Sequence, residues 1–191
     1  GYANHLGFYD EDYQKEGVQI LETEKDVILK SNIIIQMGIL DDEKLELLSE
    51  GQILIGILNS YINEKKLKKL INKKVNTFSL ELLPRITRAQ SMDVLSSQAN
   101  LAGYKAVLDS FTYYQKAIPM MMTAAGTIPA AKVLIVGAGV AGLQAIATAK
   151  RMGAIVFATD VRLASKEQVE SLGGKFLMVE GVENLETESG Y

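Results

Sequence analysis

Short, continuous apolar segments alternate with charged segments of helical pattern along this chain. In the first half, the apolar segments are residues 18–21, 32–36, 52–57 and 75–80. Between them, residues 41–50 and 64–72 carry leucines on one side of a helix and charged residues on the other. Strands that are apolar on both sides are typical of a parallel sheet covered by helices on both faces. The alternation therefore predicts an α/β fold.

Pro84 interrupts this alternation, and residues 87–116 then form one long helical pattern with a single glycine. It is longer than one crossover between parallel strands needs, so we expect an inter-domain helix. A second alternating unit follows Pro129, with strands expected at 132–136, 155–159 and 175–179 and helices at 140–152 and 164–172. We predict two Rossmann-like parallel-sheet domains: an N-terminal domain over residues 1–115, including the long helix, and a nucleotide-binding domain over 116–191.

The chain begins at Gly1, without an initiator Met or a signal peptide, and it stops at Tyr191. We therefore expect an internal fragment in which both domains are incomplete: the first lacks its start, and the second is truncated on its C-terminal side. The consecutive methionines Met120–Met122 are expected in a flexible core or hinge segment.

Composition excludes several classes of protein. Twenty Lys and Arg against 23 Asp and Glu give a net charge of −3, which argues against nucleic-acid binding. With no Cys and one His, thiol nucleophiles, Cys-ligated metals and multi-His metal sites are excluded. The most apolar stretch, residues 133–149, contains three glycines and ends at Lys150-Arg151, so a buried strand and helix explain it better than a membrane span.

A glycine-rich turn is the strongest local signal. Gly137, Gly139 and Gly142 form a G-x-G-x-x-G pattern between an expected strand and an expected helix, which is the context that dinucleotide binding requires. We expect Gly137 to permit the tight turn, Gly139 to let the backbone approach a pyrophosphate, and Gly142 to allow close packing of helix and strand. The helix N-terminus then offers N–H groups to the phosphates.

The residue at the end of the next strand is Asp160, 18 residues after Gly142. Its carboxylate can accept both ribose hydroxyls of an adenosine, and its charge would repel a 2′-phosphate, which favours NAD over NADP. Arg162 could instead contact a 2′-phosphate, but Asp160 is the better placed of the two. The alternative interpretation is a tight strand–helix turn with a solvated Asp.

A second polar cluster spans residues 84–97. If a helix begins near Arg88, then Gln90, Asp93 and Ser96 lie on one side of it as a polar stripe. Arg85 precedes that helix and could fold back on Asp93. Spacing alone slightly favours a simpler interpretation, in which a capped helix start carries a solvated face and one surface ion pair.

Several quoted stretches resemble one family of proteins. They are residues 84–106 (PRITRAQSMDVLSSQANLAGYKA), 120–143 (MMMTAAGTIPAAKVLIVGAGVAGL), 7–20 (GFYDEDYQKEGVQI), ATDVR and KEQVESLGGKF. They are similar to the NAD(H)-binding subunit of the proton-translocating NAD(P) transhydrogenases and, at the start of the chain, to its alanine dehydrogenase relatives. The resemblance covers nearly the whole chain, and the RAQSMD block is highly specific.

The resemblance implies an oxidoreductase and translocase. In that family the subunit binds NAD(H) in a cleft between two α/β domains and docks on an NADP(H)-binding domain and a membrane proton-channel subunit. Hydride passes directly between the two nicotinamides, and the reaction is coupled to proton movement. By the same resemblance we expect a homodimer, peripheral to the cytoplasmic face of the inner membrane, with no nucleic-acid or metal partner.

The resemblance also implies roles for individual residues. The nicotinamide side would consist of Arg85, Ile86, Thr87, Gln90, Asp93 and Ser96. Gly137, Gly139, Val140 and Gly142 would hold the pyrophosphate. Asp160, Val161 and Arg162 would hold the adenosine end. Gly190 and Tyr191 resemble the start of a mobile loop whose Tyr folds over the nucleotide.

Two other functions stay open from the sequence. An enzyme of the alanine dehydrogenase type needs a Lys and a His, whereas the matching positions here are Gln36 and Ile57, which cannot act in acid–base catalysis. A hydride transfer between two rings needs no such base. A non-catalytic NAD(H)-sensing module is excluded less firmly, although the intact RAQSMD block argues against it.

Overall fold

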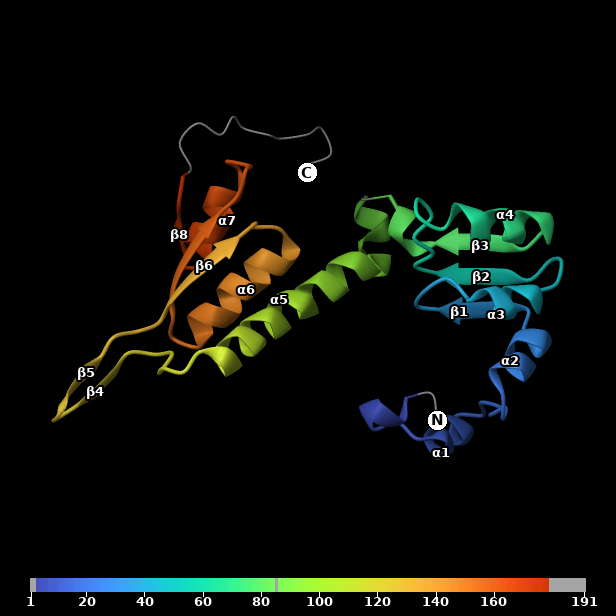
Figure 1. The fold of residues 1–191 in the computed structure, drawn as a ribbon, viewed down its shortest axis with the longest axis horizontal. Helices are drawn as coiled ribbons and strands as arrows, with labels where there is room; N and C mark the ends of the chain where they lie inside the picture. The colour runs from blue at the N-terminus through green and yellow to red at the C-terminus, as the bar shows by residue number, and fades with distance from the viewer. Residues whose placement is uncertain (1–2, 85, 179–191) are drawn as a thin grey trace. The chain divides into compact units, whose positions relative to one another are not determined.

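A computed structural model describes residues 3–84 and 86–178 of the chain. Its contacts divide the chain into two compact units, unit 1 (Gly1–Asp93) and unit 2 (Val94–Tyr191). Each unit is built on its own three-stranded parallel sheet with helices packed against it (Figure 1). The predicted α/β class with parallel sheets is therefore confirmed.

Unit 1 is a parallel sheet in the order β1-β2-β3. Its elements in chain order are η1 (Asn4–Leu6), α1 (Asp10–Lys15), α2 (Glu24–Lys30), β1 (Ile33–Gln36), α3 (Asp42–Glu46), β2 (Ile53–Gly56), α4 (Glu64–Asn72), β3 (Asn76–Ser79), η2 (Leu80–Leu82) and η3 (Thr87–Met92). The leucines of the helical patterns form the core, where Leu45, Leu54 and Leu70 are completely or almost completely buried. As predicted, the Asp41 side chain caps α3 by accepting a hydrogen bond from the Lys44 N–H at 2.9 Å.

Unit 2 begins with the long helix α5 (Val94–Tyr113) and contains a parallel sheet in the order β6-β7-β8. Its further elements are β4 (Met121–Thr123), β5 (Gly126–Ile128), β6 (Lys132–Val136), α6 (Val140–Arg151), β7 (Ile155–Thr159), α7 (Ser165–Ser171) and β8 (Lys175–Phe176). Ile146, Val156 and Val169 are fully buried between the sheet and its helices. The predicted strands and helices of this half are present, with β8 shorter than expected.

Helix α5 lies alongside α6 within unit 2 (Figure 1). The two backbones approach so closely that a Cβ added to Gly103 would lie 2.0 Å from the Ala141 carbonyl oxygen. This contact explains the position of the unit boundary. The sequence prediction placed the boundary after the long helix, at 115/116, whereas the compact units meet at Asp93 and Val94, before it.

Three local expectations differ from the structure. Residues 18–21 form no strand, although their apolar composition suggested one. The expected helix over 87–116 is two elements, because Asp93 (φ −75°, ψ 81°) interrupts it between η3 and α5. Met121 and Met122 belong to the antiparallel β4–β5 hairpin, where they are 48% and 71% exposed rather than part of a core.

Among the helices in residues 3–84 and 86–178, none combines the length and the apolar character that crossing a bilayer requires.

Candidate functional site

The glycine-rich turn connects β6 to α6 at the carboxyl end of the unit 2 sheet. Gly137 has a φ of +94°, a left-handed conformation that side chains disfavour. A Cβ on Gly142 would lie 1.8 Å from the Gly137 carbonyl oxygen, so the first turn of α6 packs directly on the glycine loop. An added Cβ at Gly139 would meet nothing within 4 Å, which leaves this backbone open to an approaching group.

Asp160 follows β7 and is joined to the glycine-rich turn by its carboxylate. The Ala138 N–H donates a hydrogen bond to Asp160 Oδ2 at 2.6 Å. The backbone N–H and Nε of Arg162 donate to Oδ1 at 2.8 and 3.0 Å, and Arg162 Nη2 donates to Oδ2 at 3.2 Å. The Asp160 side chain is only 7% exposed. The expectation of a solvated or ribose-facing carboxylate is therefore incorrect for this structure, in which Arg162 and the turn cover it.

The electrostatics of this carboxylate follow from its partners. The side-chain hydrogen bonds from Arg162 are the main cause that lowers the pKa of Asp160 from 3.8 to about 2, with the Ala138 and Arg162 N–H groups adding to the effect. Partial burial opposes them. Asp160 is consequently ionised at neutral pH and holds the glycine-rich turn against the end of β7.

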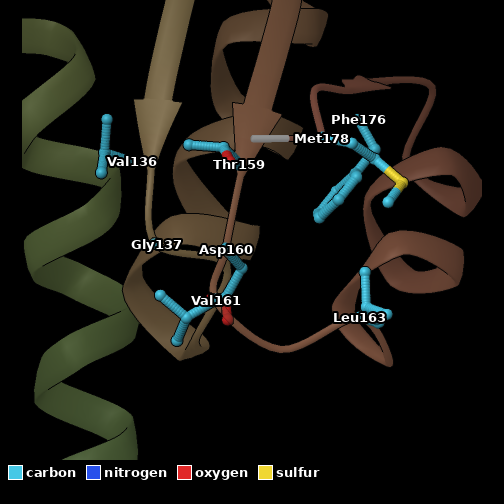
Figure 2. A pocket seen from close by; sticks show the side chains of 8 residues that line it. All are labelled: Val136, Gly137, Thr159, Asp160, Val161, Leu163, Phe176 and Met178. Atoms are coloured by element: carbon cyan, nitrogen blue, oxygen red, sulfur yellow. The ribbon is translucent and has the colours of Figure 1, made fainter. Parts of the chain in front are cut away.

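A cavity of about 390 Å³ opens beside these residues (Figure 2). Its lining residues are Val136, Gly137, Thr159, Asp160, Val161, Leu163, Phe176 and Met178. Phe176 and Met178 face Val136 across it. The sequence motifs missed these two residues, although Phe176 ends the third parallel strand, whose carboxyl end lies at the same edge of the sheet as the other two. The mostly apolar walls would suit a flat aromatic ring.

The expected nicotinamide-side residues lie on a different element. Ile86, Thr87 and Gln90 are exposed, and Asp93 is half-buried at the end of η3, where its N–H donates to the Gln90 carbonyl oxygen at 3.2 Å. The predicted polar stripe along one helix is wrong, because the chain leaves helical geometry at Asp93. Ser96 lies beyond this break, half-buried in the first turn of α5 and so in unit 2.

Three expected site residues, Arg85, Gly190 and Tyr191, lie outside the described residues. Within unit 2, the structure brings together the glycine-rich turn and the Asp160–Arg162 segment, which are more than 15 residues apart in the sequence. Val140 begins α6, and Val161 is 51% exposed beside the cavity. Across the described ranges, His, Asp and Glu side chains form no group of three or more that could hold a metal ion.

This arrangement matches two domain families. Residues 2–102 match the N-terminal domain, and residues 106–189 the C-terminal domain, of alanine dehydrogenase/PNT. The chain belongs to the alanine dehydrogenase/PNT family. The resemblance seen in the sequence motifs is therefore confirmed.

Individual members of this family differ in their similarity to the chain. It is 51% identical over 191 residues to the first part of the NAD(P) transhydrogenase alpha subunit of Rickettsia prowazekii, covering 98% of this chain and 50% of that relative. The crystal structure of transhydrogenase from Sinorhizobium meliloti superposes with a TM-score of 0.86 at 50% identity, covering 92% of this chain and 53% of that one. The alanine dehydrogenase of Methanococcus maripaludis is 29% identical over 168 residues, covering 86% and 44%. The chain thus spans about half the length of the relatives it matches.

A nicotinamide dinucleotide, which family membership implies, fits the residues of unit 2. The test is local: Gly139 leaves open space at the N-terminus of α6, and Gly142 has no room for any side chain because the turn is closed around it. Open backbone N–H groups at a helix N-terminus suit a pyrophosphate. A carboxylate at the end of the second strand suits a ribose.

Proposed function

We propose that this chain is a portion of the NAD(H)-binding component of a proton-translocating NAD(P) transhydrogenase. The observation that carries the proposal is the junction of the glycine-rich turn with Asp160, in a chain about half identical to a transhydrogenase alpha subunit. In this role the bound NAD(H) supplies or accepts the hydride, and the chain binds and orients the nucleotide.

Each segment of the chain has a distinct task in this proposal. Gly137, Gly139 and Gly142 shape the turn that receives the pyrophosphate, with Val140 at the start of the helix. Asp160, Val161 and Arg162 hold the adenosine end. Ile86, Thr87, Gln90, Asp93 and Ser96, together with Arg85, orient the nicotinamide ring so that the hydride can leave or arrive along one direction. Gly190 and Tyr191 cover the nucleotide.

The partners and the location belong to the same proposal. The name of the Rickettsia relative describes only the first portion of a divided subunit, which supports further portions that carry NADP(H) and conduct protons. We place the chain at the cytoplasmic face of the inner membrane, as one protomer of a homodimer. The exposed Met121 and Met122 of the β4–β5 hairpin offer apolar surface for a protein contact.

The alternative of an alanine dehydrogenase is disfavoured by two positions at the unit 1 sheet. Gln36 ends β1 and Ile57 follows β2, at the places where we expect the Lys and His of that enzyme. Neither an amide nor an aliphatic side chain can donate or remove a proton in catalysis. A non-catalytic NAD(H)-sensing module is the second alternative, and it differs from a transhydrogenase in transferring no hydride.

The experiment uses the complete enzyme that contains this chain. Binding of NADH and NADPH is measured by fluorescence titration, and NADH is expected to bind more tightly because the Asp160 carboxylate repels a 2′-phosphate. Equal or tighter binding of NADPH would contradict this aspect of the proposal.

Stopped-flow hydride transfer with both nucleotides saturating then separates orientation from affinity. Gln90→Asn is expected to keep NADH affinity while slowing transfer, by up to about 100-fold, since small displacements of a reacting ring are costly. Asp160→Ala is expected to weaken NADH binding and to preserve the rate at saturation. Transfer at the wild-type rate in Gln90→Asn would favour the sensing module.

A further inference from the structure

The acceptor capacity of the Asp160 carboxylate is fully used in this structure. An ionised carboxylate offers about four lone-pair positions. Four N–H groups already occupy them: those of Ala138 and Arg162 on the backbone, and Nε and Nη2 of the Arg162 side chain. With the side chain only 7% exposed, a ribose hydroxyl has neither a vacant acceptor nor access to the carboxylate.

The four donors differ in how easily they can leave. The Ala138 N–H belongs to the glycine-rich turn, and the Arg162 N–H belongs to the tight turn after β7, so both are fixed by the backbone. The guanidinium stands at the end of a flexible side chain that is 20% exposed. It holds one position on each carboxylate oxygen, Nε on Oδ1 and Nη2 on Oδ2. A ribose diol also brings two donors, one for each oxygen.

We infer that Arg162 is a resident competitor for the ribose site: its guanidinium occupies the two acceptor positions that the adenosine diol takes, and it must leave before the nucleotide binds. This inference rests on the proposed function, because it assumes that Asp160 receives the ribose. The guanidinium contributes a pair of charge-assisted hydrogen bonds to the closed state. The apparent affinity for NAD(H) is therefore lowered by the fraction of molecules in which Arg162 covers Asp160.

The competitor has an effect opposite in sign to that of an ordinary contact. An arginine that only touches the bound nucleotide strengthens binding, so removing it weakens the complex. A resident competitor weakens binding, so removing it tightens the complex. Arg162→Met separates the two cases, since methionine keeps an apolar stem and has no N–H donor. The backbone N–H groups of Ala138 and Arg162 continue to orient Asp160 in this variant.

The test measures binding of NADH and of AMP to the complete protein by isothermal titration calorimetry. Arg162→Met is expected to lower the dissociation constant of both ligands by about tenfold and to raise the association rate. AMP carries the same diol without the nicotinamide, so its affinity should change in parallel. Arg151→Met, which removes an exposed arginine at the end of α6, is the matched control and is expected to bind as the wild type does.

Unchanged or weaker NADH binding by a folded Arg162→Met variant would overturn the inference. Failure of the wild-type protein to bind either NADH or AMP would instead reject the proposed function. The wild type provides a second measurement that does not depend on the variant. The Arg162 Nε–H resonance, assigned by its absence in Arg162→Lys, should exchange slowly with water and should shift when NADH saturates the site. An Arg162 resonance unchanged at saturating NADH would also contradict displacement.

Discussion

At the scale of single residues, Asp160 has a structural role besides its proposed role in binding. Its carboxylate connects the turn before α6 to the turn after β7 through N–H groups of Ala138 and Arg162. Charge-assisted hydrogen bonds of this kind are roughly twice as strong as those between neutral groups. The same carboxylate therefore stabilises the empty site and becomes the acceptor in the occupied one.

Replacing Asp160 by Asn should lower the free energy of unfolding by about 2 kcal/mol at pH 7, as expected for a pKa of about 2 in the folded protein and 3.8 in the unfolded chain. The folded-state pKa is the lower one, so this stabilisation is complete above about pH 4 and disappears as the pH falls towards 2. Urea unfolding followed by circular dichroism, repeated across that range, measures the difference.

A matched control for this charge is Asp109→Asn, which removes an exposed carboxylate paired with Lys105 on α5. Its effect should stay within about 0.5 kcal/mol, as for other exposed ion pairs. If the Asp160→Asn and Asp109→Asn variants are equally stable at pH 7, the carboxylate does not hold the two turns together.

Gly139→Ala should separate nucleotide binding from stability. The added methyl meets nothing within 4 Å, so the melting temperature should match that of the wild type. The same methyl would stand where the pyrophosphate approaches the backbone, and we expect NADH affinity to fall by about tenfold or more. Gly38→Ala, also in open space but in unit 1, is the control and should leave both quantities unchanged. Wild-type NADH affinity in Gly139→Ala would place the pyrophosphate elsewhere.

At the scale of elements, the contact between α5 and α6 decides which unit the long helix belongs to. Gly103 and Val107 are the buried residues of α5, and Gly103 stands directly over the Ala141 backbone. Because glycine has no side chain, the two helices can approach to backbone contact. The helix thereby joins the layer that covers the unit 2 sheet.

Gly103→Ala should destabilise unit 2 although alanine is the better helix former. The gain in helix propensity is about 1 kcal/mol, but the methyl would lie 2.0 Å from the Ala141 carbonyl oxygen, and the helices must separate. We expect a net loss of about 2 kcal/mol in chemical denaturation, with Gly38→Ala as the control. A Gly103→Ala variant more stable than the wild type would show that α5 and α6 are not in backbone contact.

At the scale of the whole molecule, both units expose apolar side chains on a sheet. Ile35 of β1 is 76% exposed in unit 1, and Leu134 and Val136 of β6 are 59% and 79% exposed in unit 2. Exposed apolar surface of this kind marks protein contacts or leads to aggregation. The 191-residue chain on its own is therefore expected to self-associate and to bind NADH weakly.

The double variant Ile35→Thr, Leu134→Thr tests whether these faces cause the association. Threonine keeps a β-branched side chain suited to a strand but is much less apolar. Sedimentation velocity should show less self-association than in the unmodified chain, and binding of a hydrophobic dye should fall. Lys65→Thr and Lys68→Thr, on the exposed face of α4, provide the control substitutions. A monodisperse, dye-free unmodified chain with micromolar NADH affinity would contradict the expectation.

The sequence by itself determined the elements whose signal is local. The leucine spacing of residues 64–72 placed α4, the apolar run before Gly137 placed β6, and the glycine spacing placed the turn between β6 and α6. These predictions succeed because the period of apolar residues and the freedom of glycine act over a few neighbouring residues. Family membership was also visible there, since the quoted motifs are contiguous.

Only the tertiary structure decided features that depend on which distant groups meet. The membership of α5 in unit 2 follows from the approach of Gly103 to Ala141, a contact that no periodicity encodes. The break at Asp93 and the exposed methionine hairpin likewise oppose their local patterns. The carboxylate of Asp160 looked available from spacing alone, yet the folded chain brings Ala138 and Arg162 onto all of its acceptor positions. The residue types show which hydrogen bonds are possible, but three-dimensional proximity selects those that form.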